Sequence, residues 1–117
     1  MLIVDDHDRF RAAARALLES VGFDVVGEAA GADDALAAAA ALCPEIVLLD
    51  IQLPGRDGFE VAERLHAKGG SPVVILISSR EAEAYGDRIE RAPVAGFIAK
   101  SSLSAEAIRR LAPWRRP

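Results

Sequence analysis

The sequence predicts an α/β fold in which helices cover both faces of a five-stranded parallel sheet. Five short aliphatic runs alternate with segments of helical periodicity, the pattern of repeated strand–helix units. Two of the runs, residues 46–49 and 73–77, are continuously apolar, as is typical of strands covered on both faces. A chain of 117 residues can bury a genuine core, and we expect residues 1–117 to form a single domain.

The expected strands are short and aliphatic. They are Leu2–Val4, Val25–Val26, Ile46–Leu49, Val73–Ile77 and Phe97–Ile98. The expected helices lie between or after them, at residues 10–21, 33–42, 59–66, 80–91 and 104–113, the last of them running to Pro113.

Local signals place the helix ends. Gly22 is suited to end the first helix, and Gly69-Gly70 the third. Ser104 is a good N-cap for the fifth. Gly86 interrupts the fourth helix at a cost of about 1 kcal/mol, so we expect this helix to be the weakest.

Composition narrows the class of protein. No apolar run is long enough to cross a bilayer and the first residues are charged, so we expect a soluble, cytoplasmic protein without membrane contact. A net charge of −4 argues against nucleic-acid binding, and the basic cluster of Arg115 and Arg116 beside Trp114 needs no ligand. The single cysteine, Cys43, is interpreted as a packed thiol at a helix end.

Polar residues follow four of the expected strands. They are Asp5 and Asp6, Asp50, Ser78 and Lys100. In a parallel sheet the ligand crevice lies beyond the carboxyl ends of the strands, so these side chains should converge on one rim. Clustered carboxylates repel one another unless a cation lies among them, and oxygen ligands favour Mg²⁺. A carboxylate can also be a nucleophile toward a phosphoryl group, with a metal, an ammonium and a hydroxyl neutralising charge.

Each of these residues also has an ordinary structural interpretation. Asp5 and Asp6 would cap the first helix, Asp50 would form a turn, Ser78 would cap the fourth helix and Lys100 would be solvated. All of these structural interpretations would have to be correct at the same time to exclude the functional one.

Three further residues are given structural roles. Asp57 is assigned to turn and helix-start chemistry. His7 is expected to be an exposed neighbour of the acidic pair rather than a ligand, because Mg²⁺ prefers oxygen, and His66 to lie at the polar edge of the third helix.

The residues Asp5-Asp6, Asp50 followed by LPGRDG, Ser78 and Lys100 resemble the signature of the receiver domain of two-component response regulators. The resemblance extends from Met1 to about Leu111. It implies a flavodoxin-like (βα)5 fold with strand order 2-1-3-4-5. VDDH and AKSSLSAEAI are similar to the branch often fused to helix-turn-helix DNA-binding domains.

The resemblance implies a role for each site residue. Asp50 would accept a phosphoryl group from a histidine of a sensor kinase or phosphotransfer protein. Mg²⁺ would be held by Asp5, directly or through a water, by Asp6 and Asp50, and by the backbone carbonyl of Gln52. Lys100 and Ser78 would contact the phosphoryl oxygens. Phe97 would be a switch residue whose packing changes when the hydroxyl moves.

The resemblance implies signalling rather than turnover. The domain would catalyse only its own phosphorylation and dephosphorylation, and then act on a downstream protein or on a DNA-binding output domain that this sequence lacks. It also leaves room for a homodimer that forms on phosphorylation. Whether the chain is a stand-alone receiver or a fragment of a longer regulator stays open.

Two alternative functions remain beside this one. A degenerate receiver would act as an interaction module independent of phosphorylation. A phosphohydrolase of the haloacid-dehalogenase type is disfavoured because Gln52 stands where a second aspartate would be needed.

Several details depart from the family pattern or vary within it. Lys100 precedes Ser101 where many receivers have proline, and we expect a trans bond there because a cis bond before serine costs about 3 kcal/mol. Pro93, in the segment RAPVAGF, interrupts the usual glycine-alanine pattern before the fifth strand. We also hypothesise that Gln52 and Arg80 control the access of water to the phosphoryl group.

Overall fold

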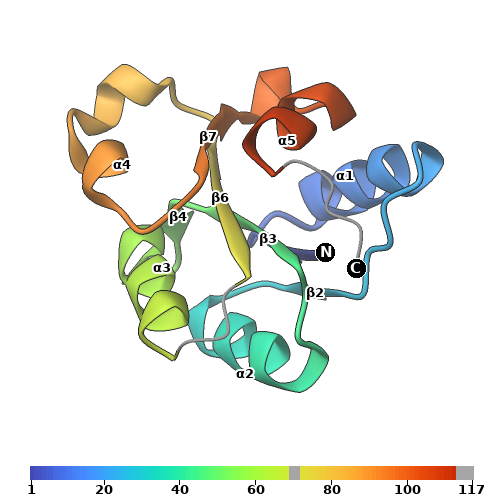
Figure 1. Ribbon diagram of the computed structural model, residues 1–117, viewed down its shortest axis with the longest axis horizontal. Helices are drawn as coiled ribbons and strands as arrows, with labels where there is room; N and C mark the ends of the chain where they lie inside the picture. Colours follow the sequence, from blue (N-terminus) through green and yellow to red (C-terminus); the bar gives the residue numbers. More distant parts are fainter. Residues whose placement is uncertain (69–71, 113–117) are drawn as a thin grey trace.

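The computed structural model describes residues 1–68 and 72–112 of the chain (Figure 1). Its centre is a parallel five-stranded sheet with the strand order β2-β1-β3-β6-β7. The strands are β1 Leu2–Val4, β2 Gly27–Ala29, β3 Ile46–Asp50, β6 Val73–Ser78 and β7 Gly96–Ala99. Counting only these strands along the chain gives the order 2-1-3-4-5, so the prediction of fold and topology is confirmed.

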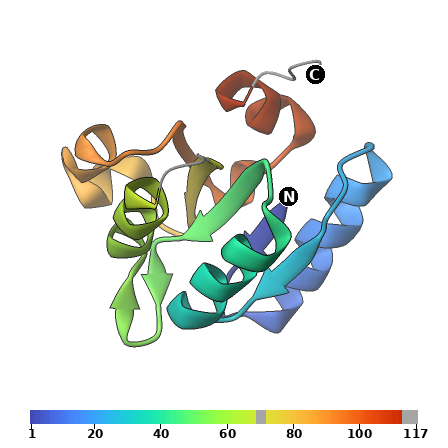
Figure 2. The same ribbon diagram turned by 60° about the horizontal axis from the view of Figure 1, so that its bottom comes forward.

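Helices lie on both faces of the sheet (Figures 1 and 2). They are α1 Asp8–Ser20, α2 Ala32–Leu42, α3 Gly58–Ala67, α4 Arg88–Arg91 and α5 Ala105–Leu111, with the 3₁₀ turns η1 Ala82–Tyr85 and η2 Lys100–Ser102. The sheet divides the core in two. One half packs under α1 and α5, and the other under α2, α3, η1 and α4.

The register of the central strands sets up one common edge. Leu2 pairs with Val47 and Ile46 pairs with Val73, so β1, β3 and β6 run in the same direction in near alignment. Residues 2–4 and 47–49 are fully buried, which explains their continuous aliphatic pattern. The carboxyl ends of these strands therefore lie next to one another.

The second strand begins later than predicted. Its pairing with β1 runs from Gly27 to Ala29, whereas Val25 and Val26 precede the strand. Val25 is buried in the core half under α1, and the Val26 amide donates to the Met1 carbonyl at 2.9 Å. The edge strand itself consists of small and polar residues, so the aliphatic pattern placed the start of the strand two residues too early.

The fourth helix is broken, as predicted. The segment forms η1, then Gly86 with a φ of 58°, then the single turn of α4. Neither piece has a fully buried residue.

A small antiparallel hairpin follows β3 and was not predicted (Figure 2). Its strands are β4 Gln52–Leu53 and β5 Arg56–Asp57. Gly55 adopts a φ of 70° after Pro54, a conformation that glycine accepts readily. The Asp57 carboxylate accepts a hydrogen bond from the Phe59 amide at 2.7 Å, which confirms its helix-start role.

Other local predictions have mixed outcomes. The Ser104 hydroxyl accepts from the Ala107 amide at 3.1 Å, so the predicted N-cap of α5 is confirmed. The prediction of a packed Cys43 thiol is wrong, because this residue ends α2 at the surface in a left-handed conformation and is exposed. Among the residues described, no peptide bond is cis, so the Lys100–Ser101 bond is trans as expected.

Some predictions fall outside the described residues. They concern Gly69, Gly70, Pro113, Trp114, Arg115 and Arg116. Within residues 1–68 and 72–112, none of the helices has the length and apolar character needed to span a membrane.

Candidate functional site

Polar groups from four strand ends meet at one edge of the sheet. Asp5 follows β1, Asp50 ends β3, Ser78 ends β6 and Lys100 follows β7. Asp5 and Ser78 are 0% exposed and Asp50 is 2% exposed, and in the described part of the chain these are the only buried polar residues. The predicted convergence of these side chains on one edge of the sheet is therefore present, and buried charged groups lie there.

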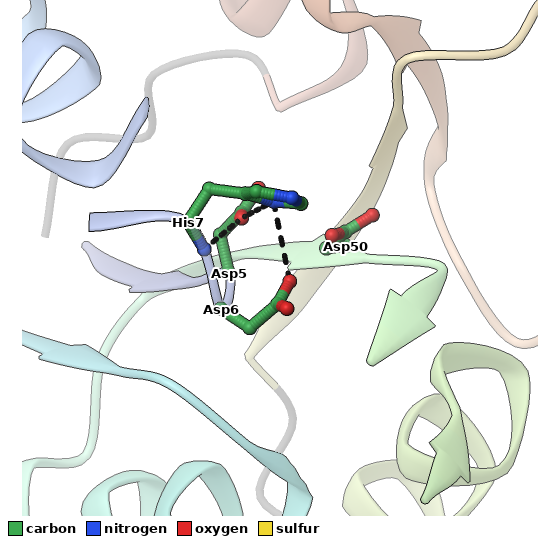
Figure 3. A group of neighbouring side chains, drawn as sticks. All are labelled: Asp5, Asp6, His7 and Asp50. Carbon is green, nitrogen blue, oxygen red and sulfur yellow. Dashed lines mark hydrogen bonds and ion pairs between the residues drawn. The ribbon is translucent and has the colours of Figure 1, made fainter. Parts of the chain in front are cut away.

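The acidic residues form one compact cluster, shown in Figure 3. Asp5, Asp6, His7 and Asp50 each offer an atom within 4.8 Å of the others. Nδ1 of His7 lies 2.9 Å from Oδ1 of Asp5 and 3.2 Å from Oδ1 of Asp6. The His7 side chain is 66% exposed and contacts both carboxylates, so it is an exposed neighbour of the acidic pair, as predicted.

Two carboxylate oxygens in this cluster are ready to accept a cation. Oδ2 of Asp5 and Oδ1 of Asp6 are buried and accept no hydrogen bond from the described residues. The groups that approach them are the Lys100 ammonium, 2.5 Å from Oδ2 of Asp5, and Nδ1 of His7, 3.2 Å from Oδ1 of Asp6. Buried carboxylate oxygens that accept no hydrogen bond are costly unless a cation lies beside them, and an oxygen-rich donor set is what Mg²⁺ prefers. The residues present therefore fit a magnesium ion.

Lys100 places its ammonium between the two buried carboxylates. Nζ lies 2.5 Å from Oδ2 of Asp5 and 3.4 Å from Oδ2 of Asp50. It also lies 4.6 Å from the centroid of the Phe10 ring, a cation–π contact. Phe10 begins the helix predicted at residues 10–21, and nothing in the sequence pattern predicts its contact with a lysine 90 positions along the chain.

The surroundings of Asp50 disfavour the charged form of its carboxyl group. Burial raises the pKa of its carboxyl group, and the nearby Asp5 raises it further, whereas the Gln52 amide and Lys100 act in the opposite direction. The backbone amide of Gln52 donates to Oδ1 of Asp50 at 3.2 Å, and Gln52 takes part in the site through this hydrogen bond.

Gly58 supports Asp50 from behind. Its amide donates to the Ile51 carbonyl at 2.8 Å, so the start of α3 lies directly against the end of β3. A β-carbon at Gly58 would overlap the Asp50 carbonyl oxygen and the Cα of Ile51. Position 58 therefore requires glycine because of close backbone approach rather than a special φ.

Ser78 is hydrogen-bonded away from the carboxylates. Its Oγ lies 2.5 Å from the hydroxyl of Tyr85 and accepts from the Arg80 amide at 3.0 Å. The Tyr85 ring packs edge-on against Phe59 and lies 6.1 Å from the ring of Phe97. Tyr85 was not predicted as a site residue. It lies in the broken fourth helix, where the sequence has no regular pattern from which its contacts could be predicted.

Comparison with known proteins decides the family. Residues 1–112 match the family model described as the response regulator receiver domain. The chain belongs to the response regulator receiver family. The resemblance inferred from Asp5-Asp6, Asp50, Ser78 and Lys100 is thereby confirmed.

Individual relatives and structures agree with this receiver assignment. The chain is 36% identical over 108 residues to the virulence-factor transcription regulator BvgA of Bordetella pertussis, covering 92% of this chain and 52% of BvgA. It is 31% identical over 110 residues to the response regulator GacA of Pseudomonas aeruginosa, covering 93% of this chain and 51% of GacA. The receiver thus spans about half the length of these curated relatives.

Solved receiver structures superpose closely on the fold. The signal receiver domain of the response regulator NarL from Mycobacterium tuberculosis has a TM-score of 0.81 at 31% identity, covering 97% of this chain and 95% of that one. A LuxR-family two-component response regulator from Aurantimonas has a TM-score of 0.84, also at 31% identity, covering 97% and 85%.

Proposed function

We propose that Asp50 is the phosphoacceptor of this receiver in a two-component phosphorelay. The observation that carries the proposal is the position of its buried carboxylate, beside the acidic pair that follows β1 and 3.4 Å from the ammonium of Lys100. Burial of a carboxylate beside another carboxylate is unfavourable unless the group has a chemical role or a compensating cation. The family assignment supports the same role.

The reaction is a transfer between two protein side chains. A carboxylate oxygen of Asp50 forms a bond to phosphorus as the phosphorus–nitrogen bond to a donor phosphohistidine breaks, and the imidazole leaves with that electron pair. Lys100, already 3.4 Å from Oδ2 of Asp50, moves its charge toward the new phosphoryl oxygens. Asp5, Asp6, Asp50 and the Gln52 carbonyl would hold Mg²⁺, which supplies charge neutralisation when bound.

Ser78 completes the phosphoryl site. Its hydroxyl turns to donate to a phosphoryl oxygen, and Phe97, in contact with Tyr85, repacks in response. The result is a shift in population between two arrangements of the β6 and β7 ends and of the η1–α4 segment. The loose packing of that segment supports this choice of moving part.

The partners follow from this role. A sensor histidine kinase or phosphotransfer protein supplies the phosphoryl group, and the changed face is recognised by a downstream protein or by a DNA-binding output domain. Phosphorylation-dependent pairing of two receivers is a further readout of the same change. The receiver performs no turnover chemistry beyond gaining and losing its own phosphoryl group.

Incubation with acetyl phosphate and Mg²⁺, followed by intact-mass measurement, tests the proposal. The wild type should gain one phosphoryl group, lose it in alkali, and gain none when EDTA replaces Mg²⁺. Asp50→Asn should gain none, while Asp34→Asn, which alters an exposed carboxylate in α2, should behave as the wild type. Absence of any adduct on the wild type would favour the interaction-module alternative.

A further inference from the structure

The hydroxyl of Tyr85 makes a short hydrogen bond to a residue of the phosphoryl site. We propose that Tyr85 is a positioning residue that holds the Ser78 hydroxyl in the unphosphorylated state and competes with the phosphoryl group for its hydrogen. This inference rests on the proposed function, because it assigns Ser78 to the phosphoryl oxygens. It goes further by naming a residue that sets how readily Ser78 is released.

The direction of the hydrogen bond follows from the donors and acceptors around Ser78. Its Oγ already accepts from the Arg80 amide at 3.0 Å, and it lies 2.5 Å from the Tyr85 oxygen. Ser78 is 0% exposed, so its single hydrogen cannot reach water. In the part of the chain that the structure describes, Tyr85 is the hydrogen-bonding group left to receive it.

The needs of Tyr85 are easier to meet. Its side chain is only partly buried, whereas Ser78 is 0% exposed. Leaving a buried hydroxyl hydrogen without an acceptor costs more than exposing one at the surface. Ser78 therefore donates and Tyr85 accepts in the unphosphorylated protein.

Ring contacts hold the tyrosine in place. Its ring centroid lies 5.9 Å from that of Phe59 in α3 and 6.1 Å from that of Phe97 in β7. The short η1 turn has no fully buried residue and is followed by Gly86, so these ring contacts and the hydrogen bond to Ser78 help to attach this segment to the rest of the domain. Phe97 has no hydroxyl, so in this cluster the polar contact to Ser78 belongs to Tyr85.

A consequence follows for the signal. A serine hydroxyl has one hydrogen, and it cannot donate to Tyr85 and to a phosphoryl oxygen at once. When Ser78 turns to the phosphoryl group, η1 loses this attachment and is freed to move. The hydrogen bond thus links the state of Asp50 to the face formed by α3, η1 and β7.

Tyr85→Phe isolates the hydroxyl, because it keeps the ring that contacts Phe59 and Phe97. We expect its apparent affinity for beryllofluoride with Mg²⁺ to rise about three- to tenfold over the wild type, the range for one net hydrogen bond. In the Ser78→Ala background, adding Tyr85→Phe should leave the affinity unchanged. An equal or lower affinity of Tyr85→Phe, with the wild type binding normally, would overturn the inference while leaving the proposed function intact.

Tyr85 is the only tyrosine in the sequence, so ¹³C-tyrosine NMR of the full chain reports on it alone. We expect the signal of the carbon that bears the hydroxyl to differ between the wild type and Ser78→Ala, and to move toward the Ser78→Ala position when beryllofluoride binds. A signal that stays fixed on binding would contradict the inference. Failure of the wild type to bind beryllofluoride with Mg²⁺ in the affinity titration would overturn both this inference and the proposed function.

Discussion

Lys100 lies closer to Asp5 than to Asp50. Its Nζ is 2.5 Å from Oδ2 of Asp5 and 3.4 Å from Oδ2 of Asp50, so one ammonium serves two buried carboxylates from neighbouring strands. In this arrangement Lys100 offsets the burial of negative charge. The same position leaves it ready to contact a group added to Asp50.

Replacing Lys100 should lower the stability of the protein and make that stability depend more on Mg²⁺. Lys100→Met leaves Asp5 and Asp50 buried without their cation, and we expect the free energy of unfolding to fall by roughly 3 kcal/mol. Added Mg²⁺ should restore more stability to this variant than to the wild type. Urea unfolding with EDTA and with Mg²⁺ measures both effects, and Lys68→Met, at the exposed end of α3, is the control. A Lys100→Met variant as stable as that control would refute this role.

The raised pKa of Asp50 predicts a pH-dependent cost of its charge. The folded state binds this proton more tightly than the unfolded state, so stability is lost as pH rises from the unfolded pKa of about 3.9 toward the raised folded value. Asp50→Asn removes that loss. In EDTA it should be more stable than the wild type at pH 7, with the difference vanishing near pH 3. A difference that grows on acidification would show that the sign is wrong.

Metal binding should depend on Asp6. Its Oδ1 is one of the two buried oxygens that accept no hydrogen bond from the described residues, so a bound cation satisfies it directly. We expect Mg²⁺ to raise the melting temperature of the wild type. For Asp6→Asn, the Mg²⁺ concentration that gives half of this rise should be at least tenfold higher. Asp34→Asn is the matched control. Equal magnesium dependence in all three proteins would exclude Asp6 as a ligand.

Gly58 should tolerate no side chain. Gly58→Ala places a methyl group against the Asp50 carbonyl and the Ile51 backbone, and we expect a loss of about 2–3 kcal/mol in the free energy of unfolding. Gly31→Ala meets no atom within 4 Å and should cost less than about 1 kcal/mol. Chemical denaturation compares the two. Similar small losses would mean that the strand end and α3 separate easily.

Gln52 and Arg80 are exposed at the rim, two residues beyond Asp50 and Ser78. If they limit the approach of water, replacing both with alanine should speed dephosphorylation by roughly threefold or more, a barrier change of about 0.7 kcal/mol. The rate is measured by the decay of the phosphorylated mass after removal of acetyl phosphate. An unchanged rate would end this hypothesis.

The fold and most of the site could be predicted from the sequence because they depend on patterns along the chain. Continuous aliphatic runs identified β3 and β6, and a parallel sheet then required Asp5, Asp50 and Ser78 to meet at one edge. The start of β2 could not be predicted, because Gly27–Ala29 pairs through its backbone and has little aliphatic content.

Contacts between distant segments were also beyond the sequence. Tyr85 meets Ser78, and Phe10 meets Lys100, only because the fold brings their elements together. The exposure of Cys43 depended on the left-handed end of α2, a conformation that composition does not reveal at a non-glycine residue.

Locating the phosphoryl group tests the central claim most directly. The protein is phosphorylated with acetyl phosphate and Mg²⁺ and reduced with borohydride, which converts an aspartyl phosphate to homoserine, and its peptides are then sequenced by mass spectrometry. We predict homoserine at position 50 and unmodified aspartate at positions 5, 6 and 57. Homoserine at another aspartate, or none at any, would contradict the assignment of Asp50 as the phosphoacceptor.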